Sequence, residues 1–199
     1  MGKMMTSSGT LGESEESDAN YMSTGKKKPG RPKKSATATP ERLPPNPFIH
    51  EILDLVSRQR SVTKKVEVLK EHRCDALVSV LIWNFDETVV SLVPEGEVPY
   101  ERNEVPVGTD HTSLRKEWKN LYHFVQGGNN SLSTIRRETM FIQVLEGLHP
   151  TEADILCLVK DGLLASKYKI TRGVVETAYP DIQWGGRGCL LYTSPSPRD

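Results

Sequence analysis

The sequence predicts an all-α fold, a compact bundle of seven or eight short helices that follows a disordered N-terminal arm. Within residues 46–186, apolar residues recur at the three- and four-residue spacing of helices that bury one face. Residues suited to helix starts precede these stretches, glycine or proline follows them, and no stretch alternates like a strand. Residues 1–45 are rich in Ser, Thr, Gly, Lys and Pro and poor in large apolar residues, so they are predicted to be disordered.

Four helices are predicted in the first half of the body. They begin at Asn46, Ser61, Asp75 and Asp86, each a residue that can cap a helix before an apolar stripe. The stripes consist of Ile49, Ile52, Leu53 and Val56; Val62, Val66 and Leu69; Leu77, Val80 and Leu81; and Val89, Val90 and Leu92. Residues 94–110, with three prolines, two glycines and many charges, form a predicted long loop. A loop of that length in a compact domain suggests a functional role.

Four more helices are predicted in the second half. One begins near Thr112 and ends at the glycine pair 127–128. The longest opens at Asn130 or Ser131 and runs to residue 149. A capping-box pattern over residues 151–154 opens the next, which Gly162 ends, and Thr171 opens a last short helix that stops before the Tyr-Pro pair 179–180.

The charge is distributed unevenly along the chain, although the formal net charge is zero. Residues 1–24 hold one basic and four acidic residues, net −3. Residues 25–46 hold seven basic and one acidic residue, net +6, and residues 47–199 hold 18 basic and 21 acidic residues, net −3. A positive field is therefore concentrated in one short segment ahead of a mildly acidic body.

The centre of that positive segment resembles an AT-hook, a short peptide that lies in the DNA minor groove. Its two prolines favour an extended backbone, and its glycine has no Cβ to keep the backbone away from the groove floor. Arginine inserts where A·T-rich sequence narrows the groove. The alternatives are a generic basic arm or a nuclear import signal. The predicted DNA-binding residues of the arm are Lys26, Lys27, Lys28, Pro29, Gly30, Arg31, Pro32, Lys33 and Lys34.

Several classes of protein are disfavoured by composition. No apolar run approaches the length of about 18 residues that a membrane span needs, and the N-terminus does not resemble a secretory signal. The three cysteines and five histidines are scattered without ligand-like spacing, so we expect neither a disulfide framework nor a metal site. We expect an intracellular protein, in the host cytoplasm if a phage encodes it and in the nucleus if the gene is eukaryotic.

Residues Asn46–Gly186 resemble an uncharacterised protein family of tailed marine phages. The resemblance implies no activity. The stretches that carry it are residues 46–50, 81–86, 94–96, 136–142 and 145–150.

The helix order is also similar to the N-terminal helical DNA-binding domain of ATP-dependent DNA ligases, chiefly over residues 155–182. This resemblance implies that residues 165–169 form a loop and that basic side chains at helix ends and loops contact DNA phosphates. The alternative is that these are the ordinary outward charges of amphipathic helices. The residues are Lys64, Lys65, Arg136, Arg137, Lys167, Lys169 and Arg172.

No pattern of residues points to catalysis. Lys160, Asp161 and Gly162 are similar to the ligase nucleophile motif Lys-x-Asp-Gly, but the intervening residue is missing and the glycine falls at a helix end. The turn 127–130 is not a Walker loop. We therefore expect no enzymatic activity, no catalytic residues, no cofactor and no metal.

The sequence thus favours a DNA-binding accessory protein that acts on double-stranded, A·T-rich DNA, with a phage replication protein as a possible partner and no membrane association. The alternative is a phage protein–protein adaptor or virion component whose body has no role in nucleic-acid binding. Residues 187–199 are expected to be a disordered tail, and residues 189–199 resemble the translation of a sequencing adaptor, so we expect them to be an artefact that obscures the true C-terminus.

Overall fold

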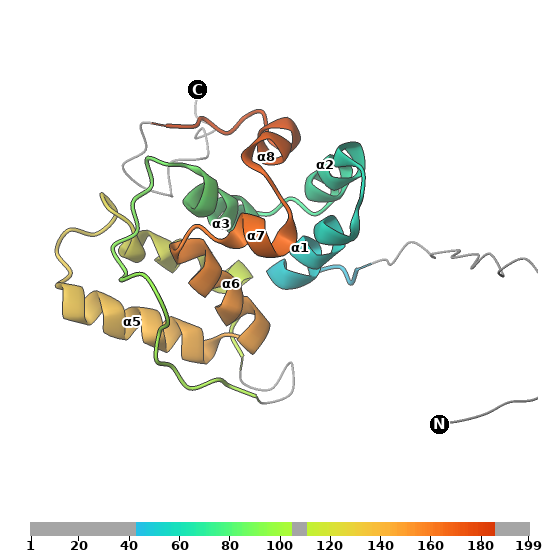
Figure 1. Ribbon diagram of the computed structural model, residues 1–199. Helices are drawn as coiled ribbons and strands as arrows, with labels where there is room; N and C mark the ends of the chain where they lie inside the picture. The colour runs from blue at the N-terminus through green and yellow to red at the C-terminus, as the bar shows by residue number, and fades with distance from the viewer. Residues whose placement is uncertain (1–42, 105–110, 186–199) are drawn as a thin grey trace, which may run out of the picture. The chain divides into compact units, whose positions relative to one another are not determined.

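The computed structural model describes residues 43–104 and 111–185. Within these residues the chain forms eight α-helices and one 3₁₀ helix, and it has no strand, which confirms the predicted all-α class (Figure 1). The helices are α1 (Ile49–Arg58), α2 (Val62–Glu71), α3 (Asp75–Phe85), α4 (Leu114–Glu117), η1 (Trp118–Phe124), α5 (Thr134–Gly147), α6 (Pro150–Lys160), α7 (Leu164–Tyr168) and α8 (Arg172–Ala178). The predicted arm, the end of the predicted loop and the C-terminal tail lie outside the described residues.

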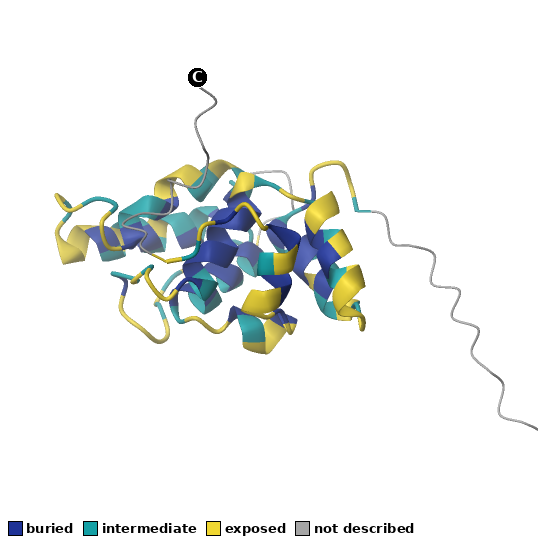
Figure 2. Ribbon diagram, turned by 90° about the horizontal axis from the view of Figure 1, so that it is seen from above, coloured by how far each residue is buried: buried dark blue, intermediate teal, exposed yellow. Residues whose placement is uncertain are grey.

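Helix α3 lies in the core of the body. Every residue from Ala76 to Trp83 is buried, and all but Ser79 are apolar, so this helix is buried on all sides. It packs against α6, α4 and η1. Figure 2 shows the buried residues, in dark blue, gathered in the interior of the body. A helix of this kind is stable only when neighbouring helices cover its whole circumference.

Helices α1, α2, α7 and α8 form one end of the body. Helix α2 packs on α1 and α8, and α1 also packs on α6 and α7. The buried Tyr179 hydroxyl donates to the Leu69 carbonyl at 2.6 Å, and Arg73 pairs with Asp181, so the segment after α8 is bound to the end of α2. The predicted end of α8 before the Tyr-Pro pair is confirmed.

Two predicted caps are replaced by other residues. Helix α1 begins at Ile49 rather than at Asn46, and the Glu51 carboxylate accepts a hydrogen bond from the Phe48 backbone N–H at 2.8 Å. Helix α6 begins at Pro150 after His149, whose Nδ1 accepts from the Thr151 N–H, so the predicted capping box over residues 151–154 is wrong. A proline at the first helical position has no N–H that needs a partner.

The longest helix, α5, also starts later than predicted. The Asn129 side chain accepts from the N–H and hydroxyl of Ser131, which forms a turn instead of opening the helix. Ser133 is the cap, and its hydroxyl accepts from the Arg136 N–H at 3.4 Å. A local side-chain turn therefore competes successfully with helix formation.

The helix predicted to begin at Asp86 is absent. The Asp86 carboxylate accepts from the N–H and hydroxyl of Thr88 and from the Gly185 N–H, so the chain turns after α3. Ser91 then forms an isolated antiparallel bridge with Val125. Residues 94–104 are irregular, as predicted for the part of the loop that the structure describes.

Helix α7 was not predicted, because the ligase resemblance implied a loop over residues 165–169. Leu164 and Tyr168 are buried, and they lie four residues apart on one face. Burial of these two side chains stabilises a single helical turn that the local sequence does not reveal.

Candidate nucleic-acid interface

The structure describes all seven basic residues that were predicted to bind DNA in the body, whereas the predicted arm 26–34 lies outside the described residues. The seven do not gather on one face. They divide into three groups. One group lies on α2, on the turn between α7 and α8 and at the start of α8, Lys167 lines a cleft along α6, and Arg136 and Arg137 lie on α5.

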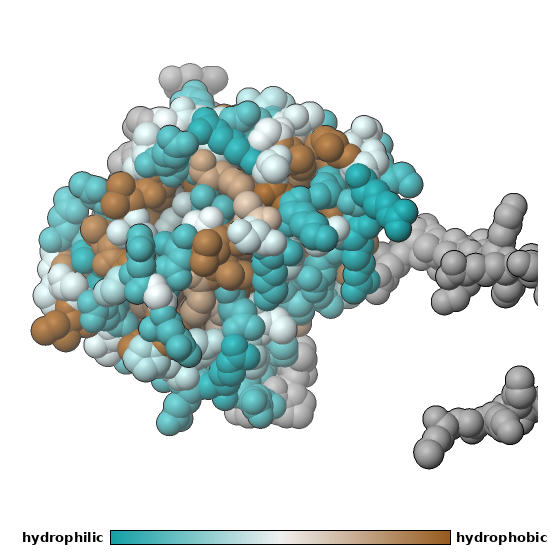
Figure 3. Space-filling model, in the orientation of Figure 1, coloured by the Kyte–Doolittle hydropathy of each residue, from teal (hydrophilic) through white to brown (hydrophobic). Residues whose placement is uncertain are grey.

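The first group lies where α2 begins and α7 ends. Lys65 Nζ donates to the Lys169 carbonyl at 2.5 Å across 104 residues of sequence. Lys64 precedes Lys65 in the first turn of α2 and is exposed. We call these three residues the basic corner. In Figure 3, hydrophilic side chains lie at the edge of the body where Figure 1 shows α2, beside a small hydrophobic patch.

Arg172 follows the basic corner in sequence, but its charge is already balanced. Its Nε donates to the Glu176 carboxylate at 2.7 Å, and its guanidinium lies 5.1 Å from the centre of the Trp184 ring. The ion pair raises the pKa of Arg172. An exposed pair of this kind contributes little to stability, and a phosphate has to compete with Glu176 for the guanidinium.

Arg136 and Arg137 lie far from the basic corner along the bundle. They sit on α5, which packs on α6 and η1, whereas α2 packs on α1 and α8. Figure 1 shows α2 and α5 at opposite ends of the body. Arg136 is exposed.

Arg137 is a structural residue. Its side chain is buried, with 6% exposed, and the guanidinium donates to the carbonyl oxygens of His123, Asn129 and Leu132 at 2.9 to 3.2 Å. It therefore fastens the turn before α5 to the end of η1. Its donors are occupied, which argues against the predicted phosphate contact at this position.

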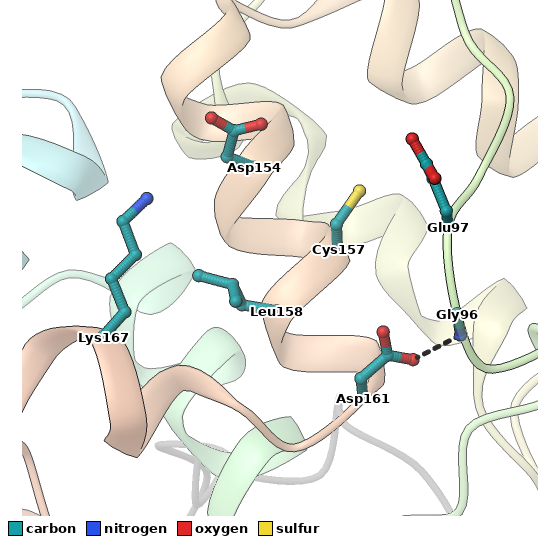
Figure 4. A pocket seen from close by; sticks show the side chains of 7 residues that line it. All are labelled: Gly96, Glu97, Asp154, Cys157, Leu158, Asp161 and Lys167. Atoms are coloured by element: carbon teal, nitrogen blue, oxygen red, sulfur yellow. Dashed lines mark hydrogen bonds between the residues drawn. The ribbon is translucent and has the colours of Figure 1, made fainter.

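Lys167 lines a cleft along α6 with a volume of about 450 Å³ (Figure 4). Cys157 and Leu158 lie along α6 between the carboxylates of Asp154 and Asp161, with Gly96 and Glu97 on one side and Lys167 on the other. The cleft is therefore mainly acidic, and it does not extend the basic corner.

Two of the three carboxylates that line the cleft have partners inside the protein. Asp154 accepts from Arg102 at 2.5 Å, and Asp161 accepts from the Gly96 N–H at 3.4 Å. Burial raises the pKa of Cys157 to about 11, so its thiol is protonated at neutral pH and is a poor nucleophile.

Lys160, the lysine of the Lys-Asp-Gly stretch, also has a structural role. Its side chain is buried, and Nζ donates to the carbonyls of Pro94 and Gly96 at 3.0 and 2.7 Å and to Asp161 at 2.6 Å. It thus holds the start of the irregular segment 94–104 against α6. Gly162 adopts a φ of 68°, which is the left-handed conformation expected of a glycine that ends a helix.

Three histidines that are scattered in the sequence meet in space. His50 and His149 are stacked with ring centres 5.7 Å apart, and His111 lies edge-on to His149 at 5.4 Å. The Thr151 hydroxyl lies 2.7 Å from His149 Nδ1 and 3.0 Å from His50 Nδ1. Sequence reasoning missed this cluster because its members come from three separate segments.

Burial lowers the pKa of both His50 and His149, so the stack favours neutral rings. Among the described residues, no group of three or more His, Cys, Asp or Glu side chains is arranged to hold a metal ion. In residues 43–104 and 111–185, no helix combines the length and the apolar character that crossing a membrane requires.

The fold and its surface define a small helical protein with a buried central helix and one basic corner. Residues 52–166, more than half of the chain, match a family described as "Family of unknown function (DUF6433)", and the chain belongs to this family. This confirms the prediction of an uncharacterised family. No curated protein and no solved structure matches the chain significantly.

Proposed function

We propose that the protein is a DNA-binding accessory protein without enzymatic activity, and that residues 26–34 make the main contact with double-stranded, A·T-rich DNA. The observation that supports this proposal is the concentration of charge, net +6 within residues 25–46 of a chain whose remainder is acidic. Six of those basic residues lie within residues 26–34, around the Gly-Arg-Pro sequence. Their binding to phosphates releases counterions, which drives association at low salt.

The body adds a weaker second contact through the basic corner. Lys64, Lys65 and Lys169 are the members of the predicted set that support this role, because Lys65 contacts Lys169 and Lys64 adjoins Lys65 in the first turn of α2. A weak contact that is linked to a stronger one gains from a high effective concentration. The division of the remaining basic residues among other surfaces limits the body to this single patch.

The test is the salt dependence of duplex binding, measured by fluorescence anisotropy from 50 to 200 mM salt on A·T-rich and G·C-rich duplexes. Deletion of residues 26–34 is expected to reduce the slope of log affinity against log salt by about 4 to 5, since each phosphate contact contributes about 0.9. Arg31→Ala is expected to remove most of the preference for A·T-rich DNA.

Arg42→Ala is the matched control, because it removes an arginine from the same basic segment outside the AT-hook-like stretch. It should reduce affinity slightly and leave the A·T preference intact. Equal affinity of the wild type and the deletion variant would overturn the proposed role of residues 26–34.

The second candidate function is a protein–protein adaptor or virion component of a phage. The cleft of α6 favours it, because the lining includes the carboxylates of Glu97, Asp154 and Asp161, which do not bind phosphates. In that case the nuclease-treated protein co-purifies with a phage replication or structural protein, and deletion of residues 26–34 does not reduce the yield of the complex.

A further inference from the structure

Lys169 has a backbone conformation that is unusual for a residue with a side chain. Its φ and ψ are 53° and 38°, and it is the one non-glycine residue with positive φ in the described part of the chain. The left-handed conformation places Cβ too close to the following carbonyl oxygen, so helices that end in this way usually have glycine or asparagine there. A lysine at this position is therefore disfavoured by local energetics.

The surrounding structure holds this conformation in place. The Lys169 N–H donates to the Ala165 carbonyl at 2.9 Å, and its own carbonyl accepts from Lys65 Nζ. Tyr168 and Ile170 on either side are buried. The turn between α7 and α8 therefore depends on the backbone of residue 169, and a glycine would make the same two hydrogen bonds with less strain.

The Lys169 side chain contributes nothing to the fold that would explain its presence. It is exposed, and its ammonium group forms no hydrogen bond or ion pair with a described residue. Backbone strain at a position where the structure does not need the side chain points to a function for that side chain.

The charges around Lys169 favour an anionic ligand. Lys65 contacts the Lys169 carbonyl and Lys64 precedes Lys65 in α2, and neither lysine has a carboxylate partner among the described residues. Arg172, the next basic residue along the chain, is paired with Glu176. Lysines at one corner whose charge no carboxylate balances favour the binding of an anion, and phosphates of a nucleic-acid backbone have this chemistry.

We propose that Lys169 is a phosphate-binding residue of the body, and that the left-handed turn is retained, at the expense of stability, because it presents the exposed Lys169 side chain at the corner where Lys65 meets the residue 169 backbone. This inference rests on the proposed function, since it names a second point at which the same DNA is bound. Residues 26–34 and the basic corner then contact phosphates of the same duplex as two linked sites.

The test separates stability from binding in the full-length protein. Lys169→Gly and Lys169→Asn both suit a left-handed turn and remove the charge, and Lys169→Arg keeps the charge and the strain. We expect the Gly and Asn variants to unfold a few degrees above the wild type. The same two variants should bind duplex DNA three- to tenfold more weakly, with a salt slope lower by about 1.

Lys169→Arg should retain the wild-type affinity and salt slope. Lys70→Asn is the matched control, because Lys70 is exposed in the last turn of α2, away from the basic corner. It should leave the salt slope within experimental error of the wild type.

The outcomes distinguish this inference from the proposed function. If the wild type binds DNA and the Gly and Asn variants bind it with unchanged affinity and slope, the phosphate contact of Lys169 is refuted and the role of residues 26–34 stands. If those variants are less stable than the wild type, the lysine side chain supports the fold and the inference is also refuted. If the wild type itself fails to bind duplex DNA at 50 mM salt, the proposed function fails.

Discussion

A single buried carboxylate joins the beginnings of two helices to a third. Glu152, in the first turn of α6, is 0% exposed. One of its carboxylate oxygens accepts from the Ile49 N–H at 2.9 Å and the other accepts from the Leu114 N–H at 2.9 Å. Ile49 and Leu114 are the first residues of α1 and α4, so their N–H groups have no partner within their own helices.

Glu152→Gln is the perturbation that isolates these hydrogen bonds. The amide has nearly the same shape, but its nitrogen is a donor, so one of the two backbone N–H groups faces another donor. A buried N–H without a partner destabilises the folded state by about 1–3 kcal/mol. Glu152→Ala leaves both N–H groups unpaired and opens a small cavity, for an expected loss of about 3–5 kcal/mol.

The pH dependence of this loss gives a second test. Burial raises the pKa of Glu152, and the hydrogen bonds from Leu114 and Ile49 offset part of that effect. Because its pKa is raised in the folded state, the Glu152 side chain stabilises the fold most when it is protonated, which is at a pH below its ordinary pKa of 4.5. This contribution is lost as the pH rises through the folded-state pKa. Glu152→Gln has no titrating group at this position, so only the wild type gains this stability, and the gap between the two should widen as the pH falls from 7 towards 5.

The measurement is urea unfolding followed by helical circular dichroism at pH 7 and pH 5. Glu67→Gln on the exposed face of α2 is the control, with an expected change within about 0.5 kcal/mol. The reasoning is refuted if Glu152→Gln unfolds at the same urea concentration as Glu67→Gln, or if the gap between Glu152→Gln and the wild type closes on acidification.

Three further predictions concern residues that hold the helices in position. Burial lowers the pKa of His149, so the stability that its neutral ring provides is present above pH 6.5 and lost as the pH falls below it. His149→Asn keeps a capping side chain without titrating, and should flatten the change in urea midpoint between pH 7.5 and 5.5. Arg137→Ala should lower the free energy of unfolding by about 2–4 kcal/mol, because three carbonyls lose their donor, whereas Arg136→Ala on the exposed face should change it by less than about 0.5 kcal/mol. Gly128→Ala would place its Cβ 1.8 Å from a backbone carbonyl oxygen, so it should lower the free energy of unfolding by about 2–3 kcal/mol. Gly173→Ala places its Cβ in open space on α8, so it should raise the free energy of unfolding by about 0.5–1 kcal/mol.

The helices were predictable where burial alone selects them. The apolar stripes of α1 and α2 consist of the same residues that the structure buries in α1 and, apart from the exposed Val62, in α2. Gly162 and the end of α8 were predictable because glycine and proline act on the backbone of their immediate neighbours. Such signals are local, so a sequence read in order contains them.

The starts of helices were predicted less well, because several possible caps compete within a few residues. Asn46 was a suitable cap for α1, but Glu152 from another helix satisfies the Ile49 N–H and fixes the start of the helix. Asp86 was a suitable cap for a further helix, but its carboxylate binds Thr88 and the distant Gly185. A partner about 100 residues away cannot be identified from local sequence.

The candidate site also combines features that the local sequence reveals with features that depend on contacts between distant segments. The charge asymmetry and the AT-hook-like stretch are properties of the sequence alone, because they depend on which residues adjoin one another in a nine-residue segment. Basic residues on separate helices have no such constraint, and whether they meet depends on how the helices pack. The packing of α2 beside α8 brings Lys65 to the carbonyl of Lys169, while Arg137 is buried beneath the end of η1.

By itself, the sequence determined an all-helical body, the position of most of its apolar stripes and a separate cationic segment, since helical periodicity and charge density are read from neighbouring residues. The tertiary structure alone decided which polar side chains are structural and which face the solvent. Lys160 and Lys169 illustrate this difference: one ammonium is buried against two carbonyls and the other is exposed on a left-handed turn. Their environments differ because contacts between distant segments set burial and backbone conformation, and nothing in the residue type encodes those contacts.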